Sequence, residues 1–339
     1  MKLLVMNTKF QVWLLIFILF FVYTYWYNDS VSFKPVKIQN FNVTHNVLVF
    51  LHIQKTGGSK LDNFLIRSLA YIDGKMECRI FSKKQKSKAK KIKNVKENGI
   101  QKNICINNKT GKQLTEWYWG RITAGWPCGV HPHYTILKAC LKKSYPQLNP
   151  DKDFFIFTML REPIKRYLSE WSHVSRGGHW IGKSQSDHCL YRNYRKCFKG
   201  KADWKGVKLK EFIDCEYNLG NNRQTLLLSD SGYDCENKTG EQMLEEAKKN
   251  LQSMAFFGLT EYQNYTQKLF LKIFSKNFKL AEVFAQSNRT FAETFIKKQN
   301  DTVQIPYLEE IKRLNKLDIE LYSFAKELFF KRLKDFRIV

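Results

Sequence analysis

The chain has 339 residues, and roughly 290 of them follow an apolar N-terminal segment, enough to bury one sizeable hydrophobic core. Lysine and arginine total 57 against 31 aspartate and glutamate residues, a formal net charge of +26. Such an excess indicates a polyanionic partner, which can be nucleic acid, an anionic membrane surface or an acidic polysaccharide. The charge by itself excludes none of these three.

The first predicted element is a membrane anchor over residues 10–27. This stretch of 18 residues is apolar or aromatic apart from one glutamine and one threonine, and that length can just span a bilayer. Lys2 and Lys9 precede it, so residues 1–9 are expected to remain cytosolic. The alternative is a cleaved signal peptide, but no small-residue cleavage site follows the apolar run. We therefore predict a single-pass type II protein with a short stem over residues 28–45.

Two further features place the rest of the chain in the secretory lumen. Seven N-x-[ST] sequons occur, as in glycoproteins. They are Asn28, Asn42, Asn108, Asn237, Asn264, Asn288 and Asn300. The eight cysteines form an even number without a C-x-x-C metal pattern, which favours disulfides. Their connectivity is open, and sequential pairs such as Cys128 with Cys140 and Cys189 with Cys197 are a working guess.

The folded domain is predicted over residues 46–335. It opens with a strand, Val47–His52, which runs into the loop "HIQKTGGS" and a helix at Ser59–Leu69. Glycines let a backbone approach an anion, and a following helix offers N–H groups and a positive dipole end. A lysine beside the glycine pair suits phosphate or sulfate, although it precedes the glycines and so departs from the nucleoside-triphosphatase pattern. An ordinary strand-to-helix turn is the alternative.

Residues 82–112 are rich in lysine and free of aromatic residues, which predicts a solvated insertion. Against a sulfated polymer, its cations could serve as a capture arm of low specificity. They are Lys83, Lys84, Lys86, Lys88, Lys90, Lys91, Lys93 and Lys96.

A second predicted strand, Phe154–Leu160, reads "FFIFTML" and is continuously apolar, as buried parallel strands are. Arg161 follows it directly, at the carboxyl edge where α/β sheets bind ligands, and a guanidinium offers a bidentate fork for phosphate. Ser169 lies about two turns along the helix predicted over residues 164–173. The alternative role of Arg161 is to cap the sheet edge by pairing with Glu162.

The remainder of the chain continues the alternation of strands and helices. Residues 176–206 are predicted to form a disulfide-pinned excursion, followed by a helix at 242–251, a strand at 255–259 and a helix at 262–274. Apolar residues at three- and four-residue spacing after Pro306 predict one long amphipathic C-terminal helix. The class is therefore α/β, with a mainly parallel central sheet flanked by helices.

The chain resembles the heparan sulfate 6-O-sulfotransferase family in four strings, "FLHIQKTGGS", "TMLREPIKRYLSEW", "YNLGNNRQ" and "MAFFGLTEYQ". The resemblance runs from about Val47 to about Arg332. It implies a P-loop-like sulfotransferase fold and a Golgi membrane enzyme with a lumenal catalytic domain. The implied donor is 3′-phosphoadenylyl sulfate, and the implied acceptor is the 6-hydroxyl of glucosamine in heparan sulfate, without a metal. The lumenal placement argues against nucleic acid as the partner.

By this resemblance, one continuous loop binds the 5′-phosphosulfate end of the donor. It comprises His52, Ile53, Gln54, Lys55, Thr56, Gly57, Gly58, Ser59 and Lys60. The family usually ends this loop with two threonines, where this chain has Ser59 and Lys60. Arg161 and Ser169 correspond to the pair that holds the 3′-phosphate.

A late segment, "QSNRTFA", is implied to add donor contacts. The residues concerned are Ala285, Gln286, Ser287, Phe291 and Ala292. Phe291 stands where the family has an arginine. Either Arg289, two residues earlier, substitutes for that arginine, or the contact is lost.

The resemblance also makes His131, in "GRITAGWPCGVH", the general base. A sugar hydroxyl must lose its proton as it attacks sulfur, and a neutral imidazole can accept one near neutral pH. From the residues alone, a loop histidine is the commoner interpretation, and His133 is a nearby rival. The implied acceptor-binding residues are Arg121, Trp126, His131, His173 and Trp180, with a looser match at Lys102 and Asn103. For His173 and Trp180 the alternatives are a helix end and a core aromatic.

Two other functions are compatible with these patterns. One is a carbohydrate sulfotransferase that acts at another acceptor position or on another polymer. The other is a catalytically inactive, membrane-anchored heparin-binding protein, which would bind heparin but not the donor nucleotide.

Overall fold

The computed structural model describes residues within one compact unit of the chain, Ile38–Val339. They are 41, 46–58, 61–62, 65, 76–80, 103–107, 118–120, 126–149, 151–178, 193–201, 203–230, 238–274 and 306–339, with 76–80 and 103–107 described by their backbone alone. The predicted anchor over residues 10–27 lies outside them. Within the described part of the chain, no helix is both long and apolar enough to cross a membrane.

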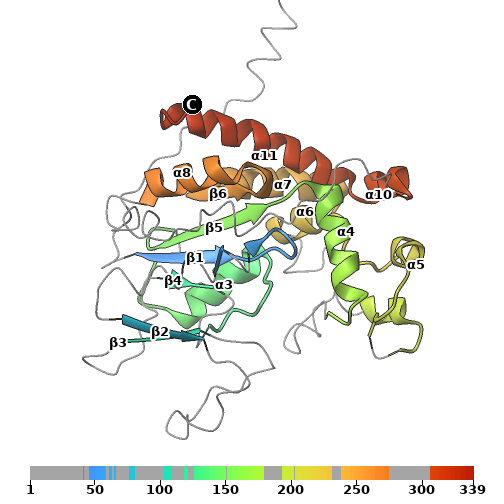
Figure 1. Cartoon of the computed structure of the whole chain (residues 1–339). Helices are drawn as coiled ribbons and strands as arrows, with labels where there is room; N and C mark the ends of the chain where they lie inside the picture. Colours follow the sequence, from blue (N-terminus) through green and yellow to red (C-terminus); the bar gives the residue numbers. More distant parts are fainter. Residues whose placement is uncertain are drawn as a thin grey trace, which may run out of the picture. The chain divides into compact units, whose positions relative to one another are not determined.

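A four-stranded parallel sheet forms the centre of this unit, in the order β4-β1-β5-β6 (Figure 1). The strands are β1 (Val47–Leu51), β4 (Tyr118–Trp119), β5 (Phe154–Leu160) and β6 (Phe256–Leu259), and all their residues are buried. Continuous apolar runs form these strands because both faces of the sheet are covered. The prediction of an α/β fold with a parallel sheet flanked by helices is confirmed.

Helices surround the sheet. They are α3 (Tyr134–Ser144), α4 (Pro163–Val174), the 3₁₀ helix η4 (Tyr194–Phe198), α5 (Leu209–Asp214), α6 (Arg223–Leu228), α7 (Gly240–Ser253), the 3₁₀ helix η5 (Thr260–Tyr262), α8 (Gln263–Phe274), α10 (Leu308–Leu314) and α11 (Lys316–Asp335). Helices α8 and α11 pack against β6, and α11 also contacts α4, α6 and α7. Figure 1 shows α4 leaving the carboxyl end of β5.

The prediction of one long C-terminal helix is wrong, because the helix breaks at Asn315 between α10 and α11. The Asn315 side chain donates to the Ile311 carbonyl at 2.9 Å and accepts from the Asn222 N–H at 3.3 Å. The apolar spacing continues through both helices, so periodicity alone gave no sign of the break. An asparagine bonded to local backbone competes with helix continuation.

The stretch predicted as a solvated insertion, residues 82–112, contains a strand. Strand β3 (Asn103–Asn107) pairs antiparallel with β2 (Met76–Ile80). In the β3 sequence "NICIN", a polar residue is followed or preceded by an apolar one at each end, which fits the two-residue period of a strand. The lysine-rich character of the whole stretch concealed that short alternation.

Pairs of phenylalanine rings pack within the core. Phe50 of β1 stacks on Phe157 of β5 with 4.8 Å between ring centroids. Phe41, inside the predicted stem, is buried and packs edge-on against Phe155 at 5.1 Å and Phe274 at 5.6 Å. The folded unit therefore extends into the stretch predicted as stem. Aromatic pairs of this geometry stabilise a core beyond the area they bury.

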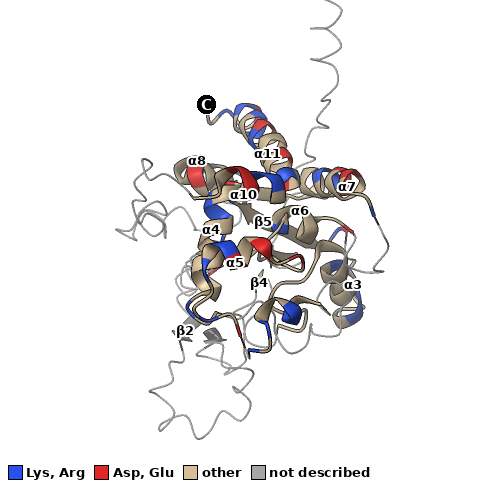
Figure 2. Cartoon of the chain, turned by 90° about the vertical axis from the view of Figure 1, so that its right-hand side faces the viewer, with Lys and Arg blue, Asp and Glu red and all other residues tan. Residues whose placement is uncertain are grey.

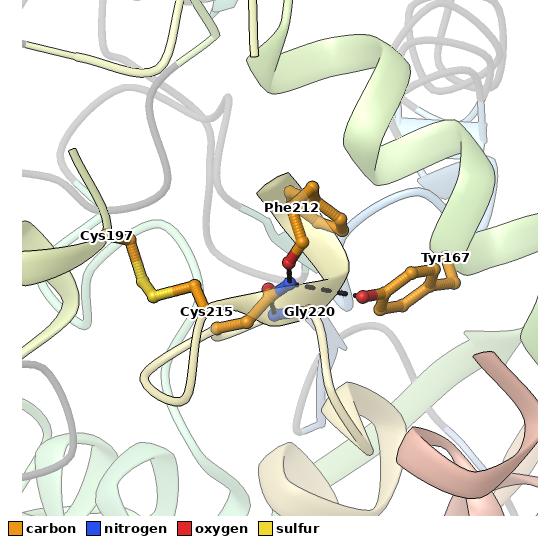
Figure 3. Close-up of a disulfide and its surroundings, with 6 residues drawn as sticks. Tyr167, Cys197, Phe212, Cys215 and Gly220 are labelled. Carbon is orange, nitrogen blue, oxygen red and sulfur yellow. Dashed lines mark hydrogen bonds between the residues drawn. A yellow bond between two sulfur atoms is a disulfide. The ribbon is translucent and has the colours of Figure 1, made fainter. Parts of the chain in front are cut away.

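Two disulfides lie in the described part of the chain. Cys128 pairs with Cys140 with their Cα atoms 5.6 Å apart, as predicted. The predicted pair of Cys189 with Cys197 is wrong, because Cys197 pairs with Cys215 at a Cα separation of 5.5 Å (Figure 3). These two cysteines pack with one hydrophobic cluster that includes residues of η4 and α5, which brings them together across 18 positions of sequence.

Asn218 orders the turn that leads from α5 into α6. Figure 3 shows its partners Tyr167, Phe212 and Gly220 together with the Cys197–Cys215 disulfide. The Asn218 side-chain amide donates to the Tyr167 hydroxyl at 3.2 Å and to the Phe212 carbonyl. Its side-chain oxygen accepts from the Gly220 N–H at 2.7 Å. Within the string "YNLGNNRQ", this buried asparagine satisfies the Gly220 N–H, and its amide joins the turn to the carbonyl of Phe212 in α5.

A buried ionic network joins α4, α6 and α11. Glu170 accepts from Arg166 and, at 2.5 Å, from Arg223, while the Asp318 carboxylate lies 3.7 Å from the Arg166 guanidinium. All four side chains are almost completely inaccessible. Burial by itself raises the pKa of the Glu170 carboxyl, but Arg223 and Arg166 outweigh it and hold that pKa below its ordinary value. The network therefore fixes three helices through one charged centre.

We predict that Glu170→Gln lowers the free energy of unfolding by roughly 3–5 kcal/mol, because it removes the nearest counter-charge of two buried guanidinium groups and leaves Arg166 with only the more distant Asp318. The lowered pKa makes the contribution of Glu170 complete above the ordinary value of 4.5, and acid removes it as the pH falls through the lower folded value. Urea unfolding between pH 3 and 7 measures both effects. Asp335→Asn, which removes an exposed pair with Lys331, is the control and should change stability little.

Candidate active site

The loop after β1 has a conformation that carries its own strain. Lys55 adopts a left-handed backbone with φ of 66°, and Gly57 follows with φ of 84°. A left-handed lysine costs about 1–2 kcal/mol, so the surrounding contacts must hold it. The buried Thr56 hydroxyl donates to the Ile53 carbonyl at 3.0 Å, which closes the turn from inside. Residues 58, 61, 62 and 65 are helical, so the loop leads into a helix N-terminus.

Gly58 is required by the space around it. A Cβ atom at this position would lie 2.5 Å from Cδ2 of His52 and 2.7 Å from Cζ of Phe50. The imidazole of His52 thus packs directly over the second glycine of the pair. Glycine at this position therefore makes room for the His52 and Phe50 rings against the loop backbone.

Arg161 meets this loop from the neighbouring strand. Because β1 and β5 pair in parallel, with Leu51 opposite Thr158, the segments that follow both strands leave the same edge of the sheet. The Arg161 guanidinium donates to the carbonyl of Lys55 at 3.2 Å. Burial lowers the pKa of Arg161, and the nearby carboxylate of Glu261 opposes that effect. An arginine in this setting remains a cation at neutral pH.

Thr260, at the end of β6, ties the same edge together. Its hydroxyl lies 2.7 Å from the Thr56 carbonyl oxygen and 2.9 Å from the Leu160 carbonyl oxygen. The loop after β1, the end of β5 and the start of η5 therefore meet at one side chain. No role was predicted for Thr260, although it lies in the string "MAFFGLTEYQ".

His131 contacts the loop at its first residue. Its Nδ1 lies 2.9 Å from the backbone oxygen of His52 and 3.0 Å from the Nδ1 of His52. A carbonyl oxygen can only accept, so the hydrogen bond to it requires a proton on Nδ1 of His131. In the neutral imidazole, Nε2 is then the nitrogen that accepts a proton. This contact was not predicted from the sequence, because 79 positions separate the two histidines.

The turn that carries His131 is held by its own covalent and polar contacts. The Cys128–Cys140 disulfide joins it to α3. The indole N–H of Trp126 donates to the Gly129 carbonyl, and the Trp126 ring lies 6.0 Å from that of Trp119. Trp126 is only 9% exposed, so one of its main roles in this structure is to order the turn.

His133, the rival histidine, has a different environment. It is 1% exposed, and its Nδ1 lies 3.0 Å from the backbone oxygen of Leu226 in α6. Its neighbours are thus in the helix layer, whereas those of His131 are in the loop after β1.

The structure brings His52, Lys55, His131 and Arg161 together through the contacts above. Other predicted residues lie elsewhere. Ser169 is half-buried on α4, and His173 is exposed in the last turn of α4, at the opposite end from Arg161. Asn103 begins β3. The predicted residues outside the described part of the chain are Ser59, Lys60, Lys102, Arg121, Trp180, Ala285, Gln286, Ser287, Phe291 and Ala292.

Two observations bear on what this site can hold. No hydrogen-bond partner reaches the buried Oε1 of Gln54 from the described residues, which leaves a polar atom that a ligand could satisfy. Within the same residues, no group of three or more histidine, cysteine, aspartate or glutamate side chains is placed to hold a metal ion.

The model of the sulfotransferase family matches residues 39–325. The chain belongs to this family. The matched range includes β1 with its loop, His131, Arg161 and the first half of α11, so the sulfotransferase site would be built from the elements described above.

Named relatives agree with this membership. The chain is 39% identical over 310 residues to heparan-sulfate 6-O-sulfotransferase 2 of Homo sapiens, covering 86% of this chain and 46% of that protein. It is 38% identical over 317 residues to the Gallus gallus protein of the same name, covering 88% of this chain and 70% of that protein. For heparan-sulfate 6-O-sulfotransferase 1 of Gallus gallus the identity is 39% over 300 residues, covering 83% and 65%. The chain thus spans about half the length of the human relative.

We predict that Gly58→Ala destabilises the protein by roughly 1–3 kcal/mol, because the new methyl group must displace the His52 ring from a packed position. The displacement should also disturb the contact between His52 and His131, so kcat should fall more than stability alone explains. Urea unfolding and initial rates measure the two effects. Gly240→Ala is the matched control, since its Cβ would approach Leu317 no closer than 3.3 Å. Equal effects of the two substitutions would contradict the close packing over Gly58.

Proposed function

We propose that this protein transfers the sulfuryl group of 3′-phosphoadenylyl sulfate to the 6-hydroxyl of glucosamine in heparan sulfate. Membership of the sulfotransferase family and the names of the relatives support the reaction class and the acceptor. The observation that carries the proposal is the hydrogen bond between His131 and the backbone of His52. It joins a proton acceptor to an anion-binding loop, and sulfuryl transfer to a hydroxyl requires both.

The donor would lie along the loop from His52 to Lys60. In this proposal the loop N–H groups and the Lys55 ammonium bind the 5′-phosphosulfate, as glycine-rich loops bind phosphate. Arg161 and Ser169 bind the 3′-phosphate, and residues 285–292 add contacts to the nucleotide. The left-handed backbone of Lys55 and the close packing of His52 against Gly58 give the loop the tight, fixed conformation that this role needs.

The transfer step follows from this arrangement. The acceptor oxygen attacks sulfur while its proton passes to Nε2 of His131. The bond between sulfur and the 5′-phosphate oxygen breaks in line, and its electron pair remains on the phosphate. Lys55 and the loop N–H groups stabilise the charge that develops there. In this proposal the cationic side chains supply all the positive charge, and no metal ion takes part.

The acceptor would contact residues on the turn before α3 and at the end of α4. Trp126, His131 and His173 are the members of this set at those two places, Asn103 lies at the start of β3, and Lys102, Arg121 and Trp180 complete the set. The segment that packs against the end of α4 carries several exposed cations. They are Arg195, Lys196, Lys199, Lys201, Lys205 and Lys208. Figure 2 marks Lys and Arg positions around α4 and α5 in blue.

Backbone contacts fix that cationic segment in place. The N–H of Gly206 donates to the Ser175 carbonyl at 2.8 Å, and the Trp171 indole donates to the Val207 carbonyl at 3.0 Å. Trp171 and Ser175, the residues at the end of α4 that make these contacts, lie on either side of His173 in the sequence. A sulfated polysaccharide that reached His173 would therefore meet a field of positive charge next to it.

Residues 10–27 would anchor the protein in the Golgi membrane as a single-pass type II protein. The folded unit would then face the lumen, where the donor and the polysaccharide meet, and nucleic acid would not be a partner. The disulfides Cys128–Cys140 and Cys197–Cys215 support an oxidising compartment.

The full chain, solubilised in detergent, tests the proposed function. It is incubated with labelled donor and desulfated heparan sulfate, and the product is cleaved to disaccharides. Label on the glucosamine 6-position is the expected result. Label at another position would identify a different carbohydrate sulfotransferase. Heparin binding without nucleotide binding would identify an inactive heparin-binding protein.

We predict separate roles for His131 and Lys55. A general base acts only on the proton that is transferred in the transition state. His131→Ala should therefore lower kcat by about 10²–10⁴ while the nucleotide product binds normally. Lys55 contacts the donor and the leaving group, so Lys55→Ala should weaken nucleotide binding and turnover together. Initial rates of transfer and calorimetric binding of the nucleotide product distinguish the two.

The control for His131 is His133→Asn. The asparagine amide can replace Nδ1 of His133 as the donor to the Leu226 carbonyl, so the variant should fold and remain substantially active. An inactive His133→Asn protein beside a fully active His131→Ala protein would assign the base to the other histidine.

We also predict that heparan binding depends strongly on salt. The net charge of +26 acts mainly through exposed side chains, which salt screens. Raising the salt concentration from about 0.1 M to about 1 M should weaken binding at least about tenfold. Deleting residues 83–96, which lie outside the described residues, should raise KM for the polymer and leave the affinity for the donor nearly unchanged. Loss of donor binding in that variant would make the stretch part of the nucleotide site instead.

A further inference from the structure

Gln224 of α6 pairs with the backbone of Arg161 at two points. The N–H of Arg161 donates to Oε1 of Gln224 at 2.9 Å, and Nε2 of Gln224 donates to the Arg161 carbonyl at 3.0 Å. Arg161 directly follows β5, so its backbone groups lie just beyond the last residue of the strand. Gln224 is 1% exposed, and it satisfies both groups in place of a neighbouring strand.

The glutamine is itself held from the opposite side. The Asp318 carboxylate of α11 accepts from the N–H of Gln224 at 3.1 Å and from the N–H of Thr225 at 2.7 Å. The next residue toward the N-terminus, Arg223, is bonded to Glu170 in the buried ionic network. The first turn of α6 is therefore fixed by α4 and α11, and the Gln224 side chain extends from a rigid support.

The pairing constrains the side chain of Arg161 as well. Two hydrogen bonds to one residue's N–H and carbonyl fix the direction of its Cα–Cβ bond. At the other end, one of the five guanidinium N–H donors is used on the Lys55 carbonyl. Arg161 is thus fixed at its backbone and at its tip, with its fork at the edge of the loop.

We propose that Gln224 is a positioning residue that orients Arg161 toward the 3′-phosphate of the donor, and that it thereby sets the preference of the site for nucleotides that carry this group. The proposal rests on the proposed function, in which Arg161 binds the 3′-phosphate. A side chain that pairs only with backbone need not touch the ligand to do this. Its effect should therefore appear in the 3′-phosphate contribution to binding and be absent from the 5′-phosphate contribution.

The test is calorimetric binding of adenosine 3′,5′-bisphosphate and adenosine 5′-phosphate to the full chain. The dissociation constant of adenosine 5′-phosphate divided by that of adenosine 3′,5′-bisphosphate measures recognition of the 3′-phosphate. Gln224→Met keeps the length of the side chain and removes both hydrogen bonds, so it should reduce the ratio by about tenfold. Gln224→Glu keeps the acceptor for the Arg161 N–H and loses the donor to its carbonyl, so it should reduce the ratio by a smaller factor. Both should bind adenosine 5′-phosphate within about twofold of the wild-type protein.

Asn250→Ala controls for general loosening of α6. The Asn250 amide donates to the Leu228 carbonyl at 2.8 Å, at the opposite end of the same helix. This variant should lose thermal stability and retain the wild-type ratio. If it lowers the ratio as much as Gln224→Met does, any loosening of α6 weakens recognition of the 3′-phosphate, and the specific role of Gln224 is refuted.

Arg161→Ala distinguishes the proposed role of Gln224 from the proposed role of Arg161 in binding the 3′-phosphate. If Arg161→Ala abolishes the preference while both Gln224 variants retain it, Gln224 does not position Arg161, and the proposed function stands. If Arg161→Ala also retains the preference, Arg161 does not bind the 3′-phosphate, and both assignments fail together. Should Gln224→Met not fold, the Gln224→Glu protein decides, because an unchanged ratio in it overturns the proposal.

Discussion

The parallel pairing of β1 with β5 is the constraint on which the site depends. Because of this pairing, the segments that follow Leu51 and Leu160 leave the sheet at the same edge. Lys55 and Arg161 are therefore in contact although 106 positions separate them. A parallel sheet fixes this edge because both strands run the same way through a buried layer. Several side chains at this edge form hydrogen bonds with the backbone of the segments that follow the two strands.

At that edge, side chains replace the ladder of hydrogen bonds. The Thr158 hydroxyl donates to the Leu51 carbonyl at 2.8 Å, and Thr260 lies within reach of the Thr56 and Leu160 carbonyls. Because buried backbone groups are costly to leave unpaired, these side chains define which loop conformations are stable. They also allow Lys55 to remain in a left-handed conformation that an unsupported loop would not keep.

The ionic centre at Glu170 connects this edge to the far helices. Arg166 lies one turn before Glu170 on α4, the helix that begins after Arg161, and Arg223 begins α6. Buried charges of this kind contribute little stability compared with an apolar core but permit few alternative arrangements. A site that must hold an anionic donor benefits from such a support, since displacements of the anchoring helices would move its cations.

The sequence by itself determined the elements whose signals are local. The apolar runs at Val47 and Phe154 predicted parallel strands, and the glycine loop and Arg161 predicted an anion site at their carboxyl ends. It also contained the strings that indicated the sulfotransferase family. Tertiary structure alone decided which partners meet: His52 with His131, Gln224 with Arg161, and Cys197 with Cys215 in place of Cys189. The break at Asn315 belongs to the same class, because its cause includes a contact with Asn222. Periodicity and motifs report what a residue does within a few positions, whereas these contacts depend on the packing of distant segments.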